Sequence, residues 1–373
     1  MNTERPASRR EFFRGSASVG STAQQPQPDT PKPTGYLEQY TKDAMACRFE
    51  ILLNRRQFQK GPQAVADGFE LLDLLEDQLS IYRDQSEVSR LNRSAPTTRT
   101  PVQTRLFHLL KLARELYEAT GGAFDITSSP LTKLWGFDKR SGTVPDAELI
   151  EQTLSQVGSD QLALELESET VSFTNPELRI NLGGIGKGYA IDRMAQLFNE
   201  REINDFIVHG GQSSVLARGN QDDFSDGSTT KHAETPNDST ADQPKDIGWT
   251  VGLSHPTVPE FRLAEFKLRN QALGTSGTGR QGFFHHGKRY GHIIDPRTGW
   301  PTNHVLSSTV ISPSAALSDA LATAFFVMDL SEVETYCKAH PEISALLVVP
   351  SKAKGKIDLE WFNLGDDQWR RLV

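Results

Sequence analysis

Cysteine is scarce in this sequence. Cys47 and Cys337 are the only two cysteines among 373 residues, and their spacing matches no metal-binding pattern. The sequence therefore excludes a disulfide framework and a cysteine-based metal site. We interpret both side chains as small buried hydrophobes.

Long apolar runs and an excess of basic residues are missing as well. No stretch approaches the roughly 20 apolar residues that span a bilayer, so we expect a soluble protein without a transmembrane segment. The 40 Lys and Arg residues are outnumbered by 48 Asp and Glu residues, for a formal net charge of -8. Nucleic-acid binders hold phosphate backbones with clustered basic side chains, so we expect no nucleic-acid partner.

The common nucleotide-binding fingerprints are absent too. A glycine-rich turn runs from Asn181 to Asp192. The Walker A pattern requires Ser or Thr after its Lys, but Gly188 follows Lys187. The Rossmann pattern requires a last Gly where this chain has Tyr189. The turn still exposes backbone N–H groups before a predicted helix, which suits an anion.

Two segments have the composition of disordered chain. Residues 1–34 begin with a twin-arginine-like motif, Ser8 to Arg14, which lacks the apolar region of an export signal. The compartment, cytoplasm or cell envelope, therefore stays open. Residues 220–247 are acidic and polar, and we predict that they form a disordered surface insertion.

Between and after these segments, helix and strand patterns predict one mixed α/β (α+β) domain over residues 35–373. Apolar residues at three- and four-residue steps predict helices over Gln63–Ile81 and Thr104–Thr120. Short apolar or alternating runs predict strands over Met45–Leu53, Phe206–Val208, Trp249–Leu253, Phe261–Leu268, Ser307–Ile311 and Ser344–Val349, with a hairpin or two over Leu162–Ile180.

The segment from Gly277 to Thr298 is rich in groups that carry chemistry. His292, Asp295 and Arg297 stand close together around Pro296 and Gly299, and turn residues of this kind mark a positioned loop. We expect a loop at a functional site here. A structural pair between the His and the Asp is the alternative.

Two further groups are candidate ligands. Asp319 and Thr323 stand four residues apart on a helix predicted from Ser318, so both oxygens project from one face and suit Mg²⁺. The alternative is a capping Asp and a Thr bonded to its own backbone. The Ala123-Phe124-Asp125 run follows a double-glycine turn, and its alternative is a turn with a buried aromatic anchor.

The order of these segments resembles the ApbE family of FAD:protein FMN transferases. The similarity covers six segments between Met45 and about Asp329: 45–51, 82–92, 121–127 with 134–137, 181–192, 275–301 and 319–323. The resemblance implies a mixed α/β fold of its own type, without a Rossmann unit. It also implies a reaction in which FAD is split at its pyrophosphate, FMN passes to a Ser or Thr hydroxyl of a target protein, and AMP leaves.

The resemblance assigns roles to individual residues. Gly184 through its carbonyl, Asp319 and Thr323 match the family's Mg²⁺ ligands, which makes Asp319 catalytic through the metal. His292 matches a histidine beside the pyrophosphate, which takes the acceptor hydroxyl's proton or steadies the phosphate charge. Positions of contact with FAD, the substrate, match Met45, Tyr82, Ala123, Phe124, Asp125, Asn181, Lys187 and Ile294.

The chain departs from the family pattern at a few positions. Asn181 and Gln212 stand where the family commonly has Asp, and Gly186 replaces a frequent Ala. The first two changes each remove a charge and add a donor, which bears on metal affinity. The implied partner is a target protein with an acceptor Thr or Ser, of the kind found as flavin-carrying redox subunits. The alternative function is an FAD-storage protein or an FAD pyrophosphatase without a protein acceptor.

Overall fold

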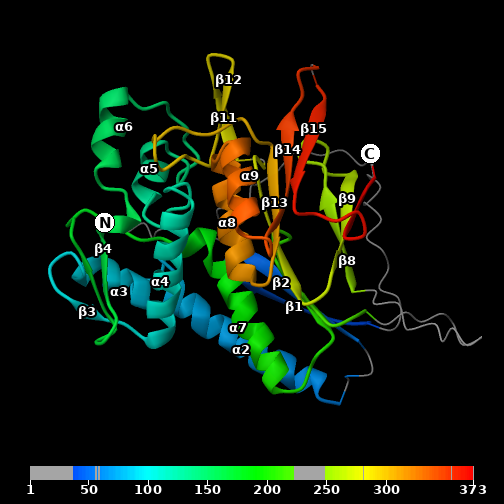
Figure 1. Ribbon diagram of the computed structural model, residues 1–373. Helices are drawn as coiled ribbons and strands as arrows, with labels where there is room; N and C mark the ends of the chain where they lie inside the picture. The colour runs from blue at the N-terminus through cyan, green and yellow to red at the C-terminus, as the bar shows by residue number, and fades with distance from the viewer. Residues whose placement is uncertain are drawn as a thin grey trace, which may run out of the picture.

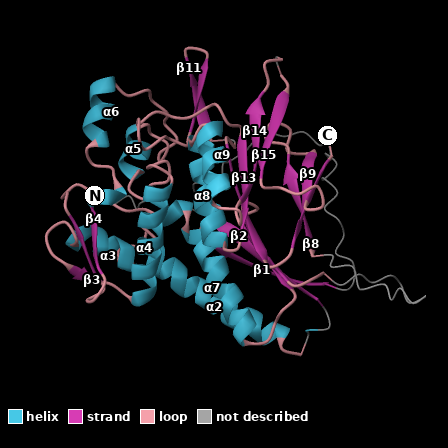
Figure 2. Ribbon diagram, in the orientation of Figure 1, coloured by secondary structure: helices cyan, strands magenta, loops and turns pink. Residues whose placement is uncertain are grey.

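The computed structural model describes residues 37–54, 57, 59–221, 248–279, 281–353 and 355–372. The tail predicted over residues 1–34 therefore lies outside the described residues, as does nearly all of the predicted insertion at 220–247. The fold is mixed α/β, as predicted (Figures 1 and 2). Among the described helices, none is long and apolar enough to cross a membrane.

An eight-stranded sheet forms the centre of the molecule, and each strand pairs antiparallel with its neighbours. An all-antiparallel sheet has no parallel βαβ unit, which agrees with the missing Rossmann fingerprint. In spatial order the strands are β1 (Leu37–Ala44), β2 (Cys47–Asn54), β6 (Phe206–Gly210), β7 (Ser214–Arg218), β10 (Gln271–Gly277), β13 (Ser307–Ser312), β14 (Ser344–Pro350) and β15 (Ile357–Phe362).

Helices cover one face of this sheet and a smaller sheet covers the other (Figure 2). The helical layer contains α2 (Gly61–Leu79), α3 (Glu87–Ser94), α4 (Thr104–Ala119), α7 (Gly186–Glu200), α8 (Ala315–Val327) and α9 (Leu330–Ala339). The smaller sheet contains β8 (Trp249–Ser254), β9 (Arg262–Leu268) and β16 (Trp369–Arg371). Strand residues alternate between the two faces, so Val208 packs under the helices while Ile207 packs against the smaller sheet.

The remaining elements lie around these layers. A three-stranded sheet is built from β3 (Thr100–Pro101), β5 (Thr170–Phe173) and β4 (Leu162–Glu165). Two short helices, α5 (Ser129–Leu134) and α6 (Ala147–Leu154), follow α4 along the chain. The 3-10 turns are η2 (Ser159–Gln161) and η3 (Leu182–Gly184), and a separate hairpin consists of β11 (Gly282–His285) and β12 (Lys288–Gly291).

The periodic segments match the predictions, and the turns correct them. The helices predicted over Gln63–Ile81 and Thr104–Thr120 are α2 and α4. The strand predicted from Met45 was wrong at its start, because Met45 and Ala46 have φ of 48° and 61° and form the turn between β1 and β2. Side chains seldom adopt such angles outside Gly and Asn, so the Met-Ala pair gave no turn signal.

Two more boundaries differ. The helix predicted from Ser318 begins at Ala315, because Ser314 is its N-cap and accepts the backbone N–H of Leu317. The segment predicted as one loop from Gly277 to Thr298 contains the β11–β12 hairpin, in which Gly282 pairs with Gly291.

The two ends of the undescribed segment 222–247 meet. The backbone N–H of Gln221 donates to the carbonyl of Gly248 at 3.3 Å, and the N–H of Gly248 donates to the side chain of Asn220 at 3.0 Å. The indole of Trp249 donates to the carbonyl of Arg218 at 2.9 Å. The residues on either side of 222–247 are therefore joined to one another.

Candidate functional site

Asp319 is a buried carboxylate at the junction of α7 and α8. Its Oδ1 accepts the hydroxyl of Ser214 at 2.5 Å. Its Oδ2 accepts the backbone N–H of Gly188 at 3.0 Å and the ammonium of Lys187 at 3.2 Å. Only 5% of the residue is exposed, so the negative charge is held in place by one cation and two hydrogen bonds.

Two glycines and a capping Asp let α7 and β10 approach α8 closely. A Cβ on Gly188 would overlap the carbonyl of Ala315, and a Cβ on Gly274 would overlap that of Ser318. Asp192 of α7 accepts the backbone N–H groups of Ala315 and Ala316, both at 2.8 Å. These contacts fix the first turn of α8 and with it the carboxylate one turn further on.

Thr323 follows Asp319 by one helical turn, and its hydroxyl lies 3.1 Å from that of Ser276 in β10. It also donates to the carbonyl of Asp319 at 3.3 Å, so the simple alternative of a Thr bonded to its own helix holds in part. The alternative of a capping Asp was wrong, because Asp319 lies inside α8 and binds groups outside it.

The glycine-rich turn lies against the same helix. Gly184 ends η3, which contacts α8, and a Cβ there would come within 3.3 Å of the ring of Phe124. Asn181 caps η3 by accepting the N–H of Gly183 at 3.0 Å, and its own N–H donates to Ile126 at 2.7 Å. The Asn at this departure from the family therefore serves as a cap.

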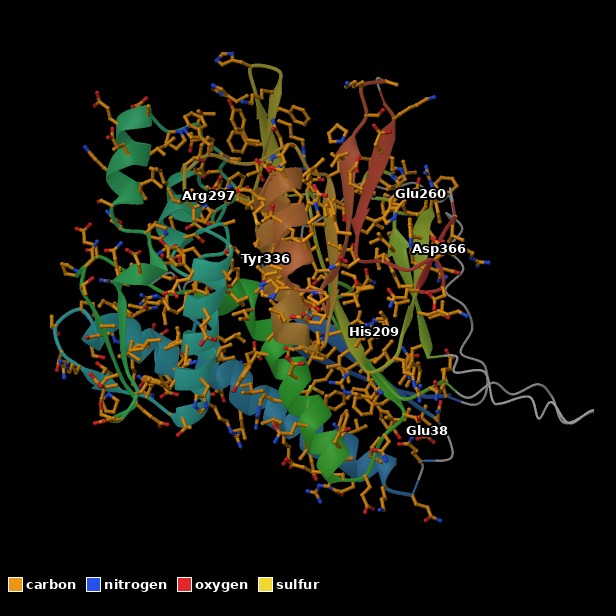
Figure 3. All side chains as sticks on the ribbon, viewed as in Figure 1. Glu38, His209, Glu260, Arg297, Tyr336 and Asp366 are labelled. Atoms are coloured by element: carbon orange, nitrogen blue, oxygen red, sulfur yellow. The ribbon has the colours of Figure 1, made fainter. Side chains whose placement is uncertain are left out.

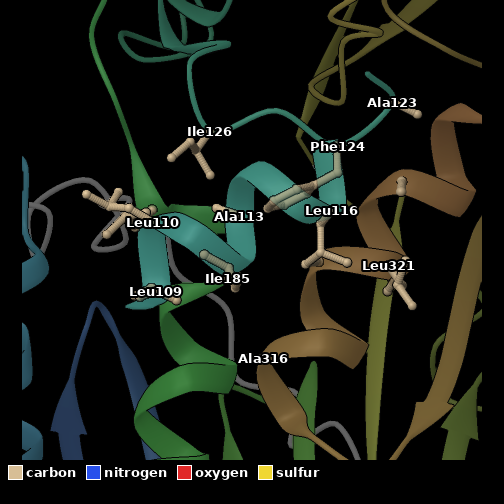
Figure 4. Close-up of a cluster of buried hydrophobic side chains, with 14 of the residues drawn as sticks. Leu109, Leu110, Ala113, Leu116, Ala123, Phe124, Ile126, Ile185, Ala316 and Leu321 are labelled. Carbon is tan, nitrogen blue, oxygen red and sulfur yellow. The ribbon is translucent and has the colours of Figure 1, made fainter. Parts of the chain in front are cut away.

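Asp125 lies in the loop after α4, where Ala123, Phe124 and Ile126 belong to the same buried core as α4 and α8, and Phe124 lies between the two helices in the view of Figure 4. Its Oδ1 accepts the hydroxyls of Thr127 and Ser159 at 2.7 and 2.6 Å. Its Oδ2 is buried and has no partner. Burial raises the pKa of this carboxyl, although the hydrogen bonds oppose that shift. Phe124 is the buried aromatic anchor of the alternative prediction, but the unpaired oxygen still offers a place for a ligand donor.

His292 follows β12 directly and is half-buried. Its Nδ1 is buried without a partner. Burial lowers the pKa of the imidazole, although a hydrogen bond with the backbone of Gln281 opposes that shift. The ring is therefore neutral near neutral pH, and a neutral imidazole can accept a proton.

The residues that follow His292 in this loop have structural roles. Asp295 pairs with Arg297, whose Nε and Nη2 lie 3.0 and 3.1 Å from its two oxygens, so the alternative of a pair between His292 and Asp295 is not what forms. Ile294 is buried and bridges to Pro301. Trp135 donates to the carbonyl of Gly299 at 2.9 Å, which ties the loop to α5.

The remaining predicted residues are less constrained. Met45, in the β1–β2 turn, packs against both helical core clusters. Tyr82 is 65% exposed. Gln212, the second departure, has φ of 64° in the turn between β6 and β7.

The predictions missed the neighbours that hold this group. Ser214, Ser276, Ser159 and Asp192 all contact predicted site residues or the helix that carries them. Single serines carry no sequence pattern, and Asp192 lies in α7, far in the chain from the first turn of α8 that it binds, so the sequence offered no signal for either.

The side chains of this site could hold a metal ion only with few protein charges. The predicted metal ligands are all oxygens, which suits a hard cation such as Mg²⁺, and the carboxylate already attracts one cation, Lys187. In the part of the chain that the structure describes, no cluster of three or more His, Cys, Asp or Glu side chains could hold a metal. Any metal ion here would therefore have a single carboxylate ligand from the described chain, and a bound substrate would have to supply further ligands.

Two surface clefts lie elsewhere. One lies between α2 and α7 and is lined by residues such as Asp67, Arg105 and Arg193. The other lies beside α9 and is lined by Asp295, Arg297 and Glu332, among others; Arg297 projects from the loop at this end of α8 and α9 (Figure 3). Neither cleft is lined by Asp319, His292 or Asp125. The candidate site is therefore defined by the chemistry of its side chains and not by a cleft.

Known proteins resemble this chain over most of its length. The ApbE family model matches residues 45–347. The chain is 31% identical over 283 residues to the FAD:protein FMN transferase of Vibrio cholerae, covering 75% of this chain and 77% of that protein. It is 30% identical over 315 residues to the enzyme of that name from Treponema pallidum, covering 82% of each.

Solved structures show the same fold. The ApbE protein of Thermotoga maritima superimposes with a TM-score of 0.72 at 27% identity, covering 86% of this chain and 96% of that one. The flavin transferase ApbE of Vibrio cholerae gives a TM-score of 0.69 at 27% identity, covering 87% and 97%. The chain belongs to the ApbE family.

Proposed function

We propose that this protein is an enzyme that transfers FMN from FAD to a target protein. Two relatives named FAD:protein FMN transferase match this chain over more than three quarters of their own length. The observation in the molecule that supports it best is the buried Asp319, held with Lys187 beside the glycine-rich turn. A protein of net charge -8 needs local cations of this kind to hold a pyrophosphate.

The finer chemistry is part of the same proposal. The acceptor is a Ser or Thr hydroxyl of the target protein, and the donor is the FMN phosphate of FAD. A new P–O bond forms to the acceptor oxygen, the pyrophosphate P–O bond breaks, and AMP leaves with that electron pair. Mg²⁺, when bound by Asp319, Thr323 and the Gly184 carbonyl, would supply charge neutralisation at the pyrophosphate.

The residues of the chain have separate tasks in this scheme. His292 takes the proton of the acceptor hydroxyl at its free ring nitrogen, because burial keeps the imidazole neutral. Lys187 holds a phosphate oxygen with its ammonium. Asp125 accepts a nucleotide donor at its unpaired Oδ2. Met45, Tyr82, Ala123, Phe124, Asn181 and Ile294 shape the FAD site.

The test is transfer itself. The purified chain is incubated with FAD and Mg²⁺, with and without a flavin-carrying redox subunit as acceptor. The proposal expects an FMN-sized mass gain on the acceptor Thr or Ser, with equal AMP release, and EDTA should abolish both.

The alternative function gives a different result in the same assay. An FAD-storage protein would bind FAD tightly without AMP release. An FAD pyrophosphatase would release AMP and free FMN whether or not an acceptor is present. Either result with several unrelated flavin-carrying subunits would replace the proposal.

A further inference from the structure

Two hairpins project from the same end of the molecule (Figure 1). One is β11–β12, with a turn at His286 and Gly287. The other is the end of β14–β15, where Pro350 pairs with Ile357. The hairpins belong to different sheets, so the two tips are separate projections.

The first hairpin has one anchored face and one free face. Phe283 packs inward, with its ring centroid 5.6 Å from that of Phe137 and 5.5 Å from that of Tyr290. Phe284 points to the opposite face by strand alternation and is 74% exposed, the highest value among the exposed large hydrophobic side chains of the described chain. The aromatic cluster holds the base while the tip stays in solvent.

The charges at the tips have one sign. His285, His286 and Lys288 are exposed on the first hairpin, and its segment Gly282–Gly291 contains no Asp or Glu. Lys352 and Lys356 are exposed on the second, where the nearest acid is Asp358 of β15. These basic tips stand out on a chain of net charge -8. α6, at the same end of the molecule (Figure 1), carries two exposed acids, Glu148 and Glu151.

We propose that the two tips dock the protein onto a membrane surface of anionic phospholipid. Phe284 would insert at the headgroup boundary, and Lys288, Lys352 and Lys356 would contact lipid phosphates. Charge attraction to a lipid surface needs no matching shape, so two separate tips can contact such a surface together. The acids of α6 confine the contact to the hairpin side.

The docking also orients the candidate site. β12 ends at Gly291, and His292 follows it in the chain. If this hairpin contacts the lipid surface, His292 lies at the other end of β12, four residues along the chain from Lys288. The inference itself rests on charge and exposure and does not depend on the proposed transfer reaction.

The experiment uses the full-length protein and sedimentation with vesicles. One vesicle set is phosphatidylcholine with about one third phosphatidylglycerol, and the other is phosphatidylcholine alone. We expect the protein to sediment with the first set only, and high salt should release it. Sedimentation with neither set would overturn the proposal.

Variants show whether the tips are responsible. The pair Lys352→Glu and Lys356→Glu should weaken binding at least tenfold, because each basic side chain near the surface contributes about a factor of five. Phe284→Ser should weaken it severalfold. The control is Lys60→Glu with Lys111→Glu, which makes the same charge change just before α2 and on α4, where each lysine belongs to an exposed ion pair. The control should stay within about twofold.

Two results would contradict the docking surface. If the control pair loses as much affinity as the tip pair, net charge alone governs binding. If immobilised polyglutamate captures the protein with the same dependence on Lys352 and Lys356 while vesicles do not, the tips recognise an acidic protein and not a lipid surface. Circular dichroism of each variant shows that the fold is retained.

Discussion

At the scale of single residues, the contact between Lys187 and Asp319 bears on metal binding. The ammonium of Lys187 lies 3.2 Å from Oδ2 of Asp319, so it competes with any metal for the carboxylate that we propose as a ligand. FAD phosphates would draw the lysine away and expose that oxygen. Metal and nucleotide binding should then support one another, since each removes an obstacle to the other.

We predict that Lys187→Met binds Mn²⁺, used as a spectroscopic substitute for Mg²⁺, at least tenfold more tightly than the unaltered protein when FAD is absent. The variant leaves Asp319 without its cation, and a divalent ion then neutralises the buried charge. Electron paramagnetic resonance of free Mn²⁺ measures the affinity. Lys187→Arg is the control, and equal affinities in all three proteins would remove the lysine from this role.

His292 gives a prediction about pH. Burial lowers its pKa below the usual value of about 6.5, so the base form persists into mildly acidic solution. Transfer should rise with pH along a limb centred below that usual value and then level off. His292→Ala should retain FAD binding, lose at least tenfold in transfer, or about 1.4 kcal/mol of barrier, and lack the limb. An unchanged limb in the variant would assign it to another group.

At the scale of elements, α7 and α8 show how much the sequence could predict. The apolar period of α2 and α4 determined those helices because one face of each is solvated. α8 is buried nearly all round, so its period marks no start, and the prediction began three residues late. The antiparallel strand order was out of reach, because pairings such as β2 with β6 join segments about 150 residues apart.

The site shows the same division. Residues that carry a distinctive pattern, such as Asp319 with Thr323 and the glycine-rich turn, could be proposed from the sequence, and their role in the site stays a prediction. Ser214 and Ser276 became visible only in the fold, because strands distant in the chain deliver them.

The close approach of α7 to α8 predicts the effect of one methyl group. Gly188→Ala would place Cβ on the carbonyl of Ala315, so we expect a loss of about 1–3 kcal/mol in the free energy of unfolding and a displaced Asp319. Gly186→Ala is the matched control in the same helix, since the atoms nearest to its added Cβ lie 3.9 Å away. It should change stability by less than about 0.5 kcal/mol. Denaturant unfolding measures both, and similar values would mean that the helices separate easily.

At the scale of the whole molecule, the burial of His209 in the central sheet makes the free energy of unfolding depend on pH. It lies on β6 (Figure 3), on the same strand face as Ile207, which packs against the smaller sheet. Burial lowers its pKa to about 4. Between its unfolded value near 6.5 and this folded value, the unfolded chain binds a proton that the folded chain does not. Stability is therefore lost as pH falls through that window.

We predict that this one imidazole costs up to roughly 3 kcal/mol of unfolding free energy between pH 7 and pH 4. His209→Asn removes the titrating group, so the difference between the two proteins should shrink or reverse toward acid. Urea unfolding at both pH values measures it. A constant difference would show that the ring is solvated enough to protonate in the folded state.

The meeting of Gln221 with Gly248 has a consequence for engineering. Because hydrogen bonds join the two flanks, the fold specifies both anchor points without reference to what connects them. Loop closure depends only weakly on length, so residues 222–247 should be replaceable by two glycines, or by an affinity tag, with Tm unchanged within about 3 °C. Differential scanning calorimetry would check this, and a large fall in Tm would show that the segment packs on the domain. The position offers an internal attachment point that leaves both chain ends free.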